Sequence, residues 1–371
     1  MVRQKPVVRW DRLRRIGRRK WPKRGPDKRE TAIEDETIMN HPRQSSQTDF
    51  YRQFSVLLWI TFGLMMLGSI GHADEPTPSG PRRPAASPSK DWKIIRGPDG
   101  PVSESSGLVP ASGGGFWTHN DSGDGPWLYH IGSDATVLHA LRLKVTRPKD
   151  WEDIAAVVID GERWLVLADT GDNLHQREKV QLLFLREPNV ENLPRGEPIL
   201  DPDASIDDEA VITVDRRVTL QYEDGPRDCE AIAVDPTTKR IILVTKTKLP
   251  WCGLYTAPLP DLTVRVDGTT PAPVSTVIAS RVRHLTIPMA TGMSIHPRTG
   301  DVLISSYFHL FHYPPMGHLH QTLAQNPAVS RMPRLGQIEA VCFGSAGRVW
   351  VSSEGQPLQL AVRDLIQQRS E

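Results

Sequence analysis

The sequence predicts an all-β protein: a β-propeller of about five four-stranded blades, preceded by an N-terminal signal or anchor segment. A two-part strand motif recurs from residue 91 to the end of the chain, and long stretches with the 3.6-residue apolar period of helices are absent from that region. Charge is also segregated, so that a basic tail precedes an acidic body. These observations favour one repeated β domain, residues 91–371, behind a separate N-terminal part.

The first half of the motif is an acidic or polar start that leads into an apolar strand. It occurs as ESSGL (104–108), DWEDIAAV (150–157), DCEAIAV (228–234), TGMSI (291–295) and QIEAVCF (337–343). The aligned positions Glu104, Glu152, Glu230, Gly292 and Glu339 are 48, 78, 62 and 47 residues apart. Four-stranded repeats near 40–50 residues with loop insertions are typical of propeller blades. The long interval from 152 to 230 leaves room for a sixth blade.

The second half of the motif follows a turn signal and ends another strand. It occurs as FWTHNDSG (116–123), WLVLADTGDN (164–173), IILVTK (241–246), VLISSY (302–307) and VWVSSEG (349–355). Further β-rich runs come after it, so each unit is expected to be an antiparallel meander of about four strands. The last unit is short of strands, and residues 91–96 (DWKIIR) are expected to supply the missing one and close the ring.

Three segments precede the propeller domain. Residues 1–53 are a basic tail, residues 54–73 hold an uncharged apolar run (54–70) and then small residues before Asp74, and residues 74–90 are a Pro/Ser-rich linker. This order is typical of a secretory signal, whereas a run of 17 residues is also at the short end for a membrane anchor. Under either hypothesis, the propeller domain is expected in the periplasm, at the cell surface or in the medium. Membrane contact is expected only through residues 54–70, if they are not cleaved.

The charge of the body limits its partners. The chain has 45 basic residues (Lys and Arg) and 44 acidic residues (Asp and Glu). Residues 1–73 hold 15 of the basic and 7 of the acidic residues, so the rest of the chain holds 30 and 37, a net charge of −7. Nucleic-acid binding needs a basic face and is therefore not expected of the body. The expected partner is an unidentified small molecule or protein.

The two halves of each motif are expected to meet at one end of the ring, because the first strand of an antiparallel hairpin begins beside the end of the second. Carboxylate and amide oxygens are the ligands that Ca²⁺ and Mg²⁺ prefer, so we predict a Ca²⁺ (or Mg²⁺) site at this mouth. The candidate metal ligands are Glu104, Asp121, Glu152, Asp169, Asp172, Glu230, Glu339 and Glu354. The candidate ligand-binding residues are Asn120, Asn173, Lys246 and Tyr307.

A purely structural role for these acids stays open. Carboxylates at the start of inner strands accept backbone N–H bonds, and Asp or Asn before Gly makes turns. Lys246 is read either as an anion-binding group or as charge balance among the acids. The histidines at 309, 312, 318 and 320 are read as a surface loop before a zinc or copper site, and three cysteines are too few for a disulfide framework. The sequence holds no G-x-S-x-G, P-loop, G-x-G-x-x-G or H-E-x-x-H motif.

The set WTHNDSG (117–123), DWEDIA (150–155), DTGDN (169–173), DCEAIA (228–233) and TGMSI (291–295) resembles a family of uncharacterised exported bacterial propellers, loosely grouped with NHL-repeat and phytase-like propellers. QIEAVC (337–342) followed by VSSEG (351–355) also looks like the inner-strand motif of β-propeller phytases. That likeness implies cations on Glu339, Glu354, Glu230 and Asp169 and phosphate on Lys246. The Asp-Asp-Pro-Ala signature of those enzymes is missing.

The sequence therefore supports two functional hypotheses. The first is an exported propeller that binds a ligand or partner at an acidic, cation-dependent channel mouth. The second is a Ca²⁺-dependent, phytase-like hydrolase, a phosphoesterase or esterase in which a bound cation lowers the pKa of water.

Overall fold

The computed structural model describes residues 91–121, 123–145, 148–193, 211–262 and 274–365. The basic tail, the signal or anchor segment and the Pro/Ser-rich linker predicted for residues 1–90 lie outside the described residues. Among the described residues, no helix is both long and apolar enough to cross a membrane.

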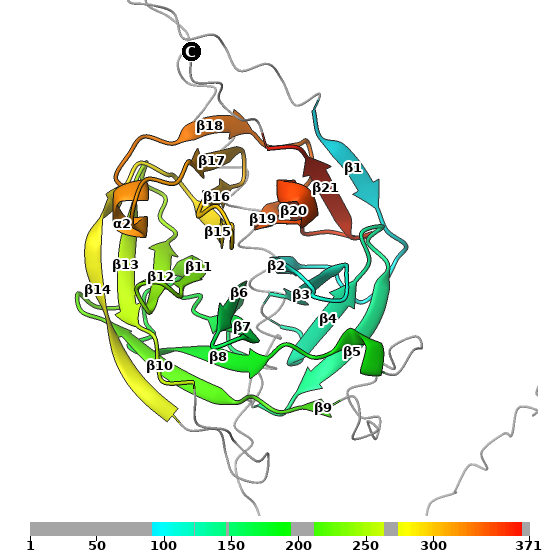
Figure 1. The fold of residues 1–371 in the computed structure, drawn as a ribbon, viewed down its shortest axis with the longest axis horizontal. Helices are drawn as coiled ribbons and strands as arrows, with labels where there is room; N and C mark the ends of the chain where they lie inside the picture. The colour runs from blue at the N-terminus through cyan, green and yellow to red at the C-terminus, as the bar shows by residue number, and fades with distance from the viewer. Residues whose placement is uncertain (1–90, 122, 146–147, 194–210, 263–273, 366–371) are drawn as a thin grey trace, which may run out of the picture. The chain divides into compact units, whose positions relative to one another are not determined.

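The described residues form five antiparallel blades around a central axis (Figure 1). Blade 1 consists of β2 (Ser105–Pro110), β3 (Phe116–Asn120), β4 (Trp127–Ile131) and β5 (Val137–Leu143), with β9 (Val211–Ile212) parallel to β5 at its edge. Blade 2 consists of β6 (Trp151–Ile159), β7 (Glu162–Asp169), β8 (Val180–Arg186) and β10 (Arg216–Tyr222). Blade 3 consists of β11 (Cys229–Asp235), β12 (Arg240–Thr245), β13 (Cys252–Pro258) and β14 (Val274–Leu285).

Blade 4 consists of β15 (Ala290–Ile295), β16 (Val302–Ser306), β17 (His309–Tyr313) and β18 (Ala328–Arg331). Blade 5 consists of β19 (Ile338–Phe343), β20 (Val349–Ser353), β21 (Gln359–Arg363) and β1 (Lys93–Arg96). The described helical segments are short: η1 (Val190–Asn192), α2 (Leu319–Thr322) and η3 (Ser345–Gly347). The predicted all-β propeller is thus confirmed, and the described residues make up five blades.

The ring closes as the sequence predicts, because β1 pairs with β21 at the outer edge of blade 5. Trp92, just before β1, donates its indole N–H to the carbonyl of Arg331 in blade 4 at 3.2 Å. The guanidinium of Arg363 lies 4.6 Å from the centroid of the Trp92 ring. The start of the propeller domain is therefore fixed to its last two blades, and strand pairing joins the two ends of the domain.

Turn chemistry explains how the first two strands of a blade fold back. Between β11 and β12 the carboxylate of Asp235 accepts hydrogen bonds from the N–H of Thr237 at 2.9 Å and the hydroxyl of Thr238 at 2.6 Å. Lys239 completes this turn with a φ of 52°. Short Asp side chains that bond the backbone two residues on are a common cause of such turns.

The core consists of five apolar clusters, one between each pair of neighbouring blades. Between blades 2 and 3, for example, Trp164 and Phe184 lie in the same buried cluster as Leu243 and Tyr255. This face-to-face burial is the main stabilising contribution expected for packed sheets. The inner strands β2, β6, β11, β15 and β19 contact one another in ring order, so apolar packing holds five strand starts around one axis.

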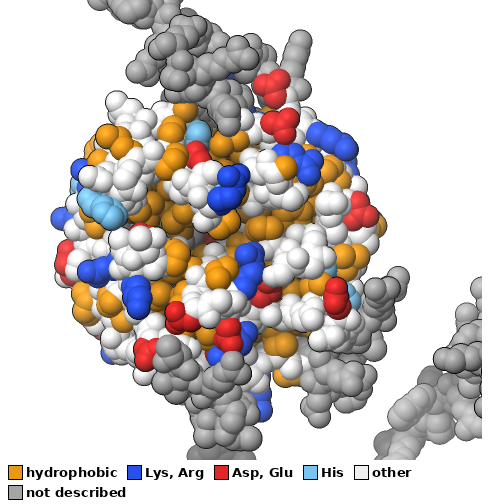
Figure 2. Space-filling view, viewed as in Figure 1, with side chains coloured by type: hydrophobic (Ala, Val, Ile, Leu, Met, Phe, Trp, Pro, Cys, Tyr) orange, Lys and Arg blue, Asp and Glu red, His pale blue; other side chains and the backbone are white. Residues whose placement is uncertain are grey.

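Blades 2 and 3 are also joined at their outer edges. β10 and β14 pair in parallel from Arg217 opposite Val274 to Tyr222 opposite Ala279, which makes one eight-stranded sheet of the two blades. In the space-filling view, acidic and basic side chains lie interspersed with apolar ones around the rim of the disc (Figure 2).

Candidate metal centre at the propeller mouth

Every blade carries a register slip at the start of its inner strand. The slip leaves one residue between two paired positions, as in a β-bulge, and a bulge re-aims the side chain of its extra residue. The five extra residues are Ser106, Glu152, Glu230, Thr291 and Glu339. All five are buried. We call the end of the ring where these strands begin the mouth.

The chemistry of the extra residue divides the blades into two kinds. In blades 1 and 4 it is a short hydroxyl that bonds the backbone of the next inner strand: Ser106 to the carbonyl of Glu152 at 2.8 Å, and Thr291 to that of Ile338 at 3.1 Å. In blades 2, 3 and 5 it is a glutamate, whose longer side chain extends into the mouth. The ring of glutamates at this position is therefore incomplete, with its gaps at blades 1 and 4.

This register corrects the sequence alignment of the repeat. Glu104, aligned there with Glu152, lies two residues before the extra residue of blade 1 and is exposed. Its structural counterpart in blade 2 is Asp150, because both carbonyls accept a backbone N–H from the end of the second strand. In blade 4 the residue that corresponds to Glu152 is Thr291, one residue before Gly292, which the sequence alignment had placed there. A single unpaired residue is not visible as a pattern in the sequence.

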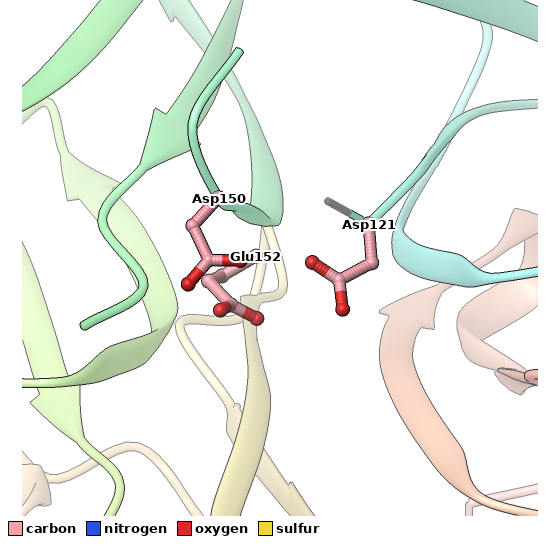
Figure 3. Close-up of side chains that lie close together, drawn as sticks. All are labelled: Asp121, Asp150 and Glu152. Carbon is pink, nitrogen blue, oxygen red and sulfur yellow. The ribbon is translucent and has the colours of Figure 1, made fainter. Parts of the chain in front are cut away.

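Three carboxylates from two blades converge at the mouth (Figure 3). Asp150 precedes β6, Glu152 lies at its start and Asp121 follows the end of β3. One carboxylate oxygen of each lies within 4.8 Å of the other two. Glu152 is 5% exposed, whereas Asp121 and Asp150 are half-buried. We call these three residues the outer triad; their hard oxygen donors can hold a metal ion.

A second group overlaps the first. Glu152, Asp228 and Glu230 also offer oxygens that all lie within 4.8 Å of one another, and the three side chains are buried. We call them the inner triad. Glu152 belongs to both groups, so carboxylates of blades 1, 2 and 3 form one continuous cluster.

Gly171 makes room for this cluster. A Cβ at this position would lie 2.5 Å from Cγ of Asp150, and still closer to Oδ2 of Asp150 and Oε1 of Glu152. The φ of Gly171 is not in the left-handed region, so the glycine is required here by close approach and not by backbone conformation. The glycine of the DTGDN segment thus clears space for two carboxylates.

Asp169 and Asp172, predicted as metal ligands, accept several hydrogen bonds from the protein. Asp169 accepts the backbone N–H of Asp150 at 3.1 Å and the guanidinium of Arg177 at 2.7 Å. Asp172 accepts the N–H groups of Gln176 and Arg177, each at 2.8 Å. Both carboxylates therefore shape the loop beside the cluster. Neither belongs to the two groups that can hold a metal ion.

Arg177, which the sequence analysis missed, fixes this loop. Its guanidinium donates to the carbonyls of Gly171 at 2.6 Å and Asp169 at 3.0 Å in addition to the Asp169 carboxylate. The loop also reaches the next blade, because the N–H of Asp172 donates to Asp228 at 2.8 Å. Arg177 thus positions Gly171, whose missing side chain the cluster requires, and it occupies no recognisable place in the repeat.

Lys246 places a positive charge beside the buried acids of the mouth. Its ammonium contacts Oε1 of Glu230 at 2.5 Å and lies 5.0 Å from the ring centroid of Tyr307. The opposite oxygen of this carboxylate, Oε2 of Glu230, is buried and has no hydrogen-bond partner. These contacts fit the interpretation that Lys246 balances the charge of the surrounding acids.

The rest of the mouth is a hydrogen-bonded polar group from blades 4 and 5. Gln337 donates to Glu339 at 2.6 Å and to Glu354 at 3.2 Å, and the ring of Tyr307 lies 5.0 Å from the ammonium of Lys246. The structure thus brings Lys246, Tyr307, Glu339 and Glu354 together at the mouth.

The two asparagines predicted to bind ligand differ in their surroundings. The side-chain oxygen of Asn120 accepts the N–H groups of Ser103 and Glu104, and its amide donates to the carbonyl of Pro101 and to Asp124. Asn173 is exposed. The contacts of Asn120 are those of a residue that shapes the loop, and its chain neighbour Asp121 belongs to the acidic cluster. Ligand binding by either asparagine stays a prediction.

Burial and mutual repulsion disturb the ionisation of the acids. Desolvation by burial, and then the charges of Glu230, Asp121, Asp150 and Asp228, raise the pKa of Glu152 well above its usual range. Burial is also the largest cause that raises the pKa of Asp150 to about 6 and that of Glu354 to about 8. Closely spaced carboxylates are tolerated only with protons, donors or a cation between them, so this cluster is suited to take up positive charge.

Asp153, next to the extra residue of blade 2, has a different role. Its carboxylate accepts the N–H groups of Ile154 at 2.8 Å, Ile232 at 2.8 Å and Met293 at 3.3 Å, which belong to blades 2, 3 and 4. It is 1% exposed. Asp153 therefore ties three inner strands together inside the channel.

The histidines at 309–320 do not form a metal site with neighbouring acids or cysteines among the described residues. His312 pairs with Asp301 at 2.7 Å, and the rings of His318 and His320 stack at 5.9 Å around the start of α2. Cys229, Cys252 and Cys342 are buried and free of disulfides.

Comparison with known proteins adds little on function. No family model matches the chain, and no curated protein matches it in sequence. Similar solved structures include a crystal structure of glucose dehydrogenase (13% identity, TM-score 0.38, 74% of this chain and 100% of that one) and a second glucose dehydrogenase (14%, 0.38, 74% and 99%). A third is the apo-form of the soluble aldose sugar dehydrogenase from Escherichia coli (13%, 0.37, 74% and 100%).

Likeness at this level identifies neither a ligand nor an activity for this chain. What the fold and the site define is a class: a five-bladed propeller with a buried acidic cluster, able to hold a metal ion, at one end of its channel. The propeller implied by the sequence resemblance is confirmed. Membership of an NHL-repeat or phytase family stays a prediction.

Proposed function

We propose that this protein is an exported propeller that binds Ca²⁺ at its mouth and uses the bound ion to hold an anionic group of a ligand or partner. The observation that carries this proposal is the outer triad, in which Asp121, Asp150 and Glu152 present oxygens within 4.8 Å of one another at a half-buried position. A cation there is accessible enough to keep part of its coordination for a ligand.

Ca²⁺ suits this site better than Mg²⁺. Ca²⁺ accepts six to eight oxygens in flexible geometry, whereas Mg²⁺ demands a near-ideal octahedron and gives up its waters reluctantly. Here the carboxylates come from two blades, two of them already lie against the backbone at Gly171, and further acids lie close by. We therefore expect Ca²⁺ to bind more tightly than Mg²⁺.

Titration calorimetry and thermal unfolding of residues 91–371 test the proposal. Ca²⁺ is expected to raise Tm and a chelator to reverse the rise, because a ligand that binds only the folded state stabilises it. Glu152→Gln removes the shared carboxylate and should abolish the rise, whereas Glu191→Gln, which changes an exposed glutamate of η1, should leave it unchanged. A Tm that does not respond to Ca²⁺ in the unmodified protein would exclude a cation-dependent mouth.

One observation favours the alternative of a metal-assisted hydrolase. The pKa of Glu354 is raised to about 8, first by burial and then by the charge of Glu339. A carboxyl group that is still protonated near neutral pH can act as a general acid. Turnover of p-nitrophenyl phosphate or carboxylic esters with Ca²⁺, lost in Glu354→Gln while Ca²⁺ binding persists, would support hydrolysis. Absence of turnover on a broad ester panel would leave binding alone.

Export is part of the proposal and is tested separately. The apolar run 54–70 with small residues before Asp74 supports cleavage by a signal peptidase. N-terminal sequencing of the mature protein should give Asp74, and a membrane-bound chain that retains residues 54–70 would show an anchor instead.

A further inference from the structure

The geometry points to a second cation site beneath the first. We propose that Glu152, Asp228 and Glu230 hold an inner cation and that Glu152 bridges it to the outer cation held with Asp121 and Asp150. This inference rests on the proposed function, because the outer cation is the one through which a ligand is held. It adds a two-cation centre with Glu152 as its shared ligand.

The overlap of the two triads is the first observation. Each is a set of three oxygens within 4.8 Å of one another, and Glu152 is the one residue that they have in common. A carboxylate has two oxygens and can give one to each of two ions, which in two-metal sites lie about 3.5–4 Å apart. Two separate sites would need six side chains, whereas this cluster supplies five.

The second observation is an unsatisfied oxygen. Glu230 is 3% exposed, and its Oε2 is buried with no hydrogen-bond partner. A buried, unpaired carboxylate oxygen costs free energy unless a donor or a cation compensates it. Lys246 holds the other oxygen, Oε1, at 2.5 Å. The ammonium therefore fixes the orientation of the carboxylate without satisfying both of its oxygens.

The surroundings position the inner triad. The N–H of Asp172 donates to Oδ1 of Asp228 at 2.8 Å and holds that carboxylate against the loop of blade 2. Glu152 and Glu230 are the extra residues of two neighbouring register slips, so equivalent backbone irregularities turn both side chains into the mouth. Ligands held by independent hydrogen bonds and strand packing are preorganised for a metal ion.

The two triads differ in burial, and we expect the two cations to differ in role accordingly. Glu152, Asp228 and Glu230 are each 5% exposed or less, whereas Asp121 and Asp150 are half-buried. The inner cation is therefore enclosed by protein and neutralises buried charge, and the outer cation faces the ligand. Because both ions share one carboxylate and repel each other, the second equivalent of cation should bind more weakly than the first.

Two readouts test the proposal on residues 91–371. Elemental analysis after equilibrium dialysis against Ca²⁺ counts the ions per chain, and electron paramagnetic resonance with Mn²⁺ reports whether two ions are close enough for spin coupling. The variants are Asp121→Asn for the outer site, Asp228→Asn for the inner site and Glu152→Gln for both. Asp228→Asn keeps a side-chain oxygen for the N–H of Asp172, and circular dichroism with thermal unfolding confirms that each variant is folded.

The expected result is two ions and a coupled Mn²⁺ signal in the unmodified protein. Asp121→Asn and Asp228→Asn should each retain one ion without coupling, with the affinity of the altered site lowered about tenfold or more, and Glu152→Gln should weaken both sites. One ion in the unmodified protein, unaffected by Asp228→Asn but lost in Asp121→Asn, would overturn the two-cation centre and leave the proposed function standing. Absence of any ion would overturn both.

Discussion

The cluster depends on the missing side chain of Gly171, and Gly171→Ala is the most selective way to disturb it. The substitution changes no charge and suits the backbone, because the φ of Gly171 lies outside the left-handed region. The new Cβ would lie 2.5 Å from Cγ of Asp150, whereas ordinary contact begins at 3.4 Å, so Asp150 has to retreat by at least 0.9 Å (3.4 less 2.5). Metal–ligand distances tolerate only about 0.2 Å.

We therefore expect Gly171→Ala to lower the affinity for Ca²⁺ at least about tenfold, which is about 1.4 kcal/mol. The accompanying loss of folding stability should be that of a local overpacking, about 1–3 kcal/mol. Titration calorimetry measures the first quantity and denaturant unfolding without Ca²⁺ the second.

Gly100→Ala is the matched control for this experiment. A Cβ at Gly100 would meet only the side chain of Val137 at 3.9 Å, which is ordinary contact, and its φ is also outside the left-handed region. It should bind Ca²⁺ as the unmodified protein does. If Gly171→Ala bound Ca²⁺ with unchanged affinity, the carboxylates beside it would not be the ligands, and the assignment of the outer triad would be wrong.

The remaining predictions concern pH, Lys246 and Arg177. The folded state raises the pKa of Asp150 from 3.8 to about 6 and that of Glu354 from 4.5 to about 8, so it binds these protons more tightly than the unfolded state. The contribution of these two protons to stability without Ca²⁺ is therefore fully present below about pH 4 and lost as pH rises to about 8. Tm should fall over this window without Ca²⁺ and be restored by Ca²⁺; a Tm that rises with pH in a chelator would contradict the pKa assignment. Lys246→Met removes the positive charge beside Glu230 and should lower Tm without Ca²⁺, since breaking a buried pair costs about 3–5 kcal/mol, while calorimetry shows tighter Ca²⁺ binding; weaker binding would mean that Lys246 supports the cation site. Arg177→Lys keeps the charge but cannot make all three bonds to the loop of Gly171, so Ca²⁺ affinity should fall about tenfold; unchanged affinity would show that the loop keeps its conformation without these three bonds.

Periodicity explains why the architecture was predictable. The strand starts at 150 and 228 and their partner strands recur with the same polar-then-apolar order, and residues 91–96 were needed to complete the last blade. Hairpin geometry then places strand starts beside strand ends within a blade, and the ring gathers these ends of all blades at one mouth. The approach of Asp121 to Glu152 therefore also followed from the sequence. These inferences need only the identity and order of strands.

Features that depend on register and on loop conformation were not predictable. The slip at Glu152 decides that this side chain enters the mouth, and a shift of one position moves a side chain to the other face of a strand. The same effect displaced Glu104 from the place assigned to it. Arg177 follows the DTGDN segment in an irregular loop, and the parallel pairing of β10 with β14 joins residues that are far apart in the sequence.

The central claim is that a cation binds between Asp121, Asp150 and Glu152. Crystals of residues 91–371 soaked in Mn²⁺ or a lanthanide, with anomalous diffraction recorded at the metal's absorption edge, test it most directly. An anomalous peak within coordination distance of all three carboxylates is the predicted result. Peaks confined to other surface acids, with these carboxylates bound only to one another, would contradict it.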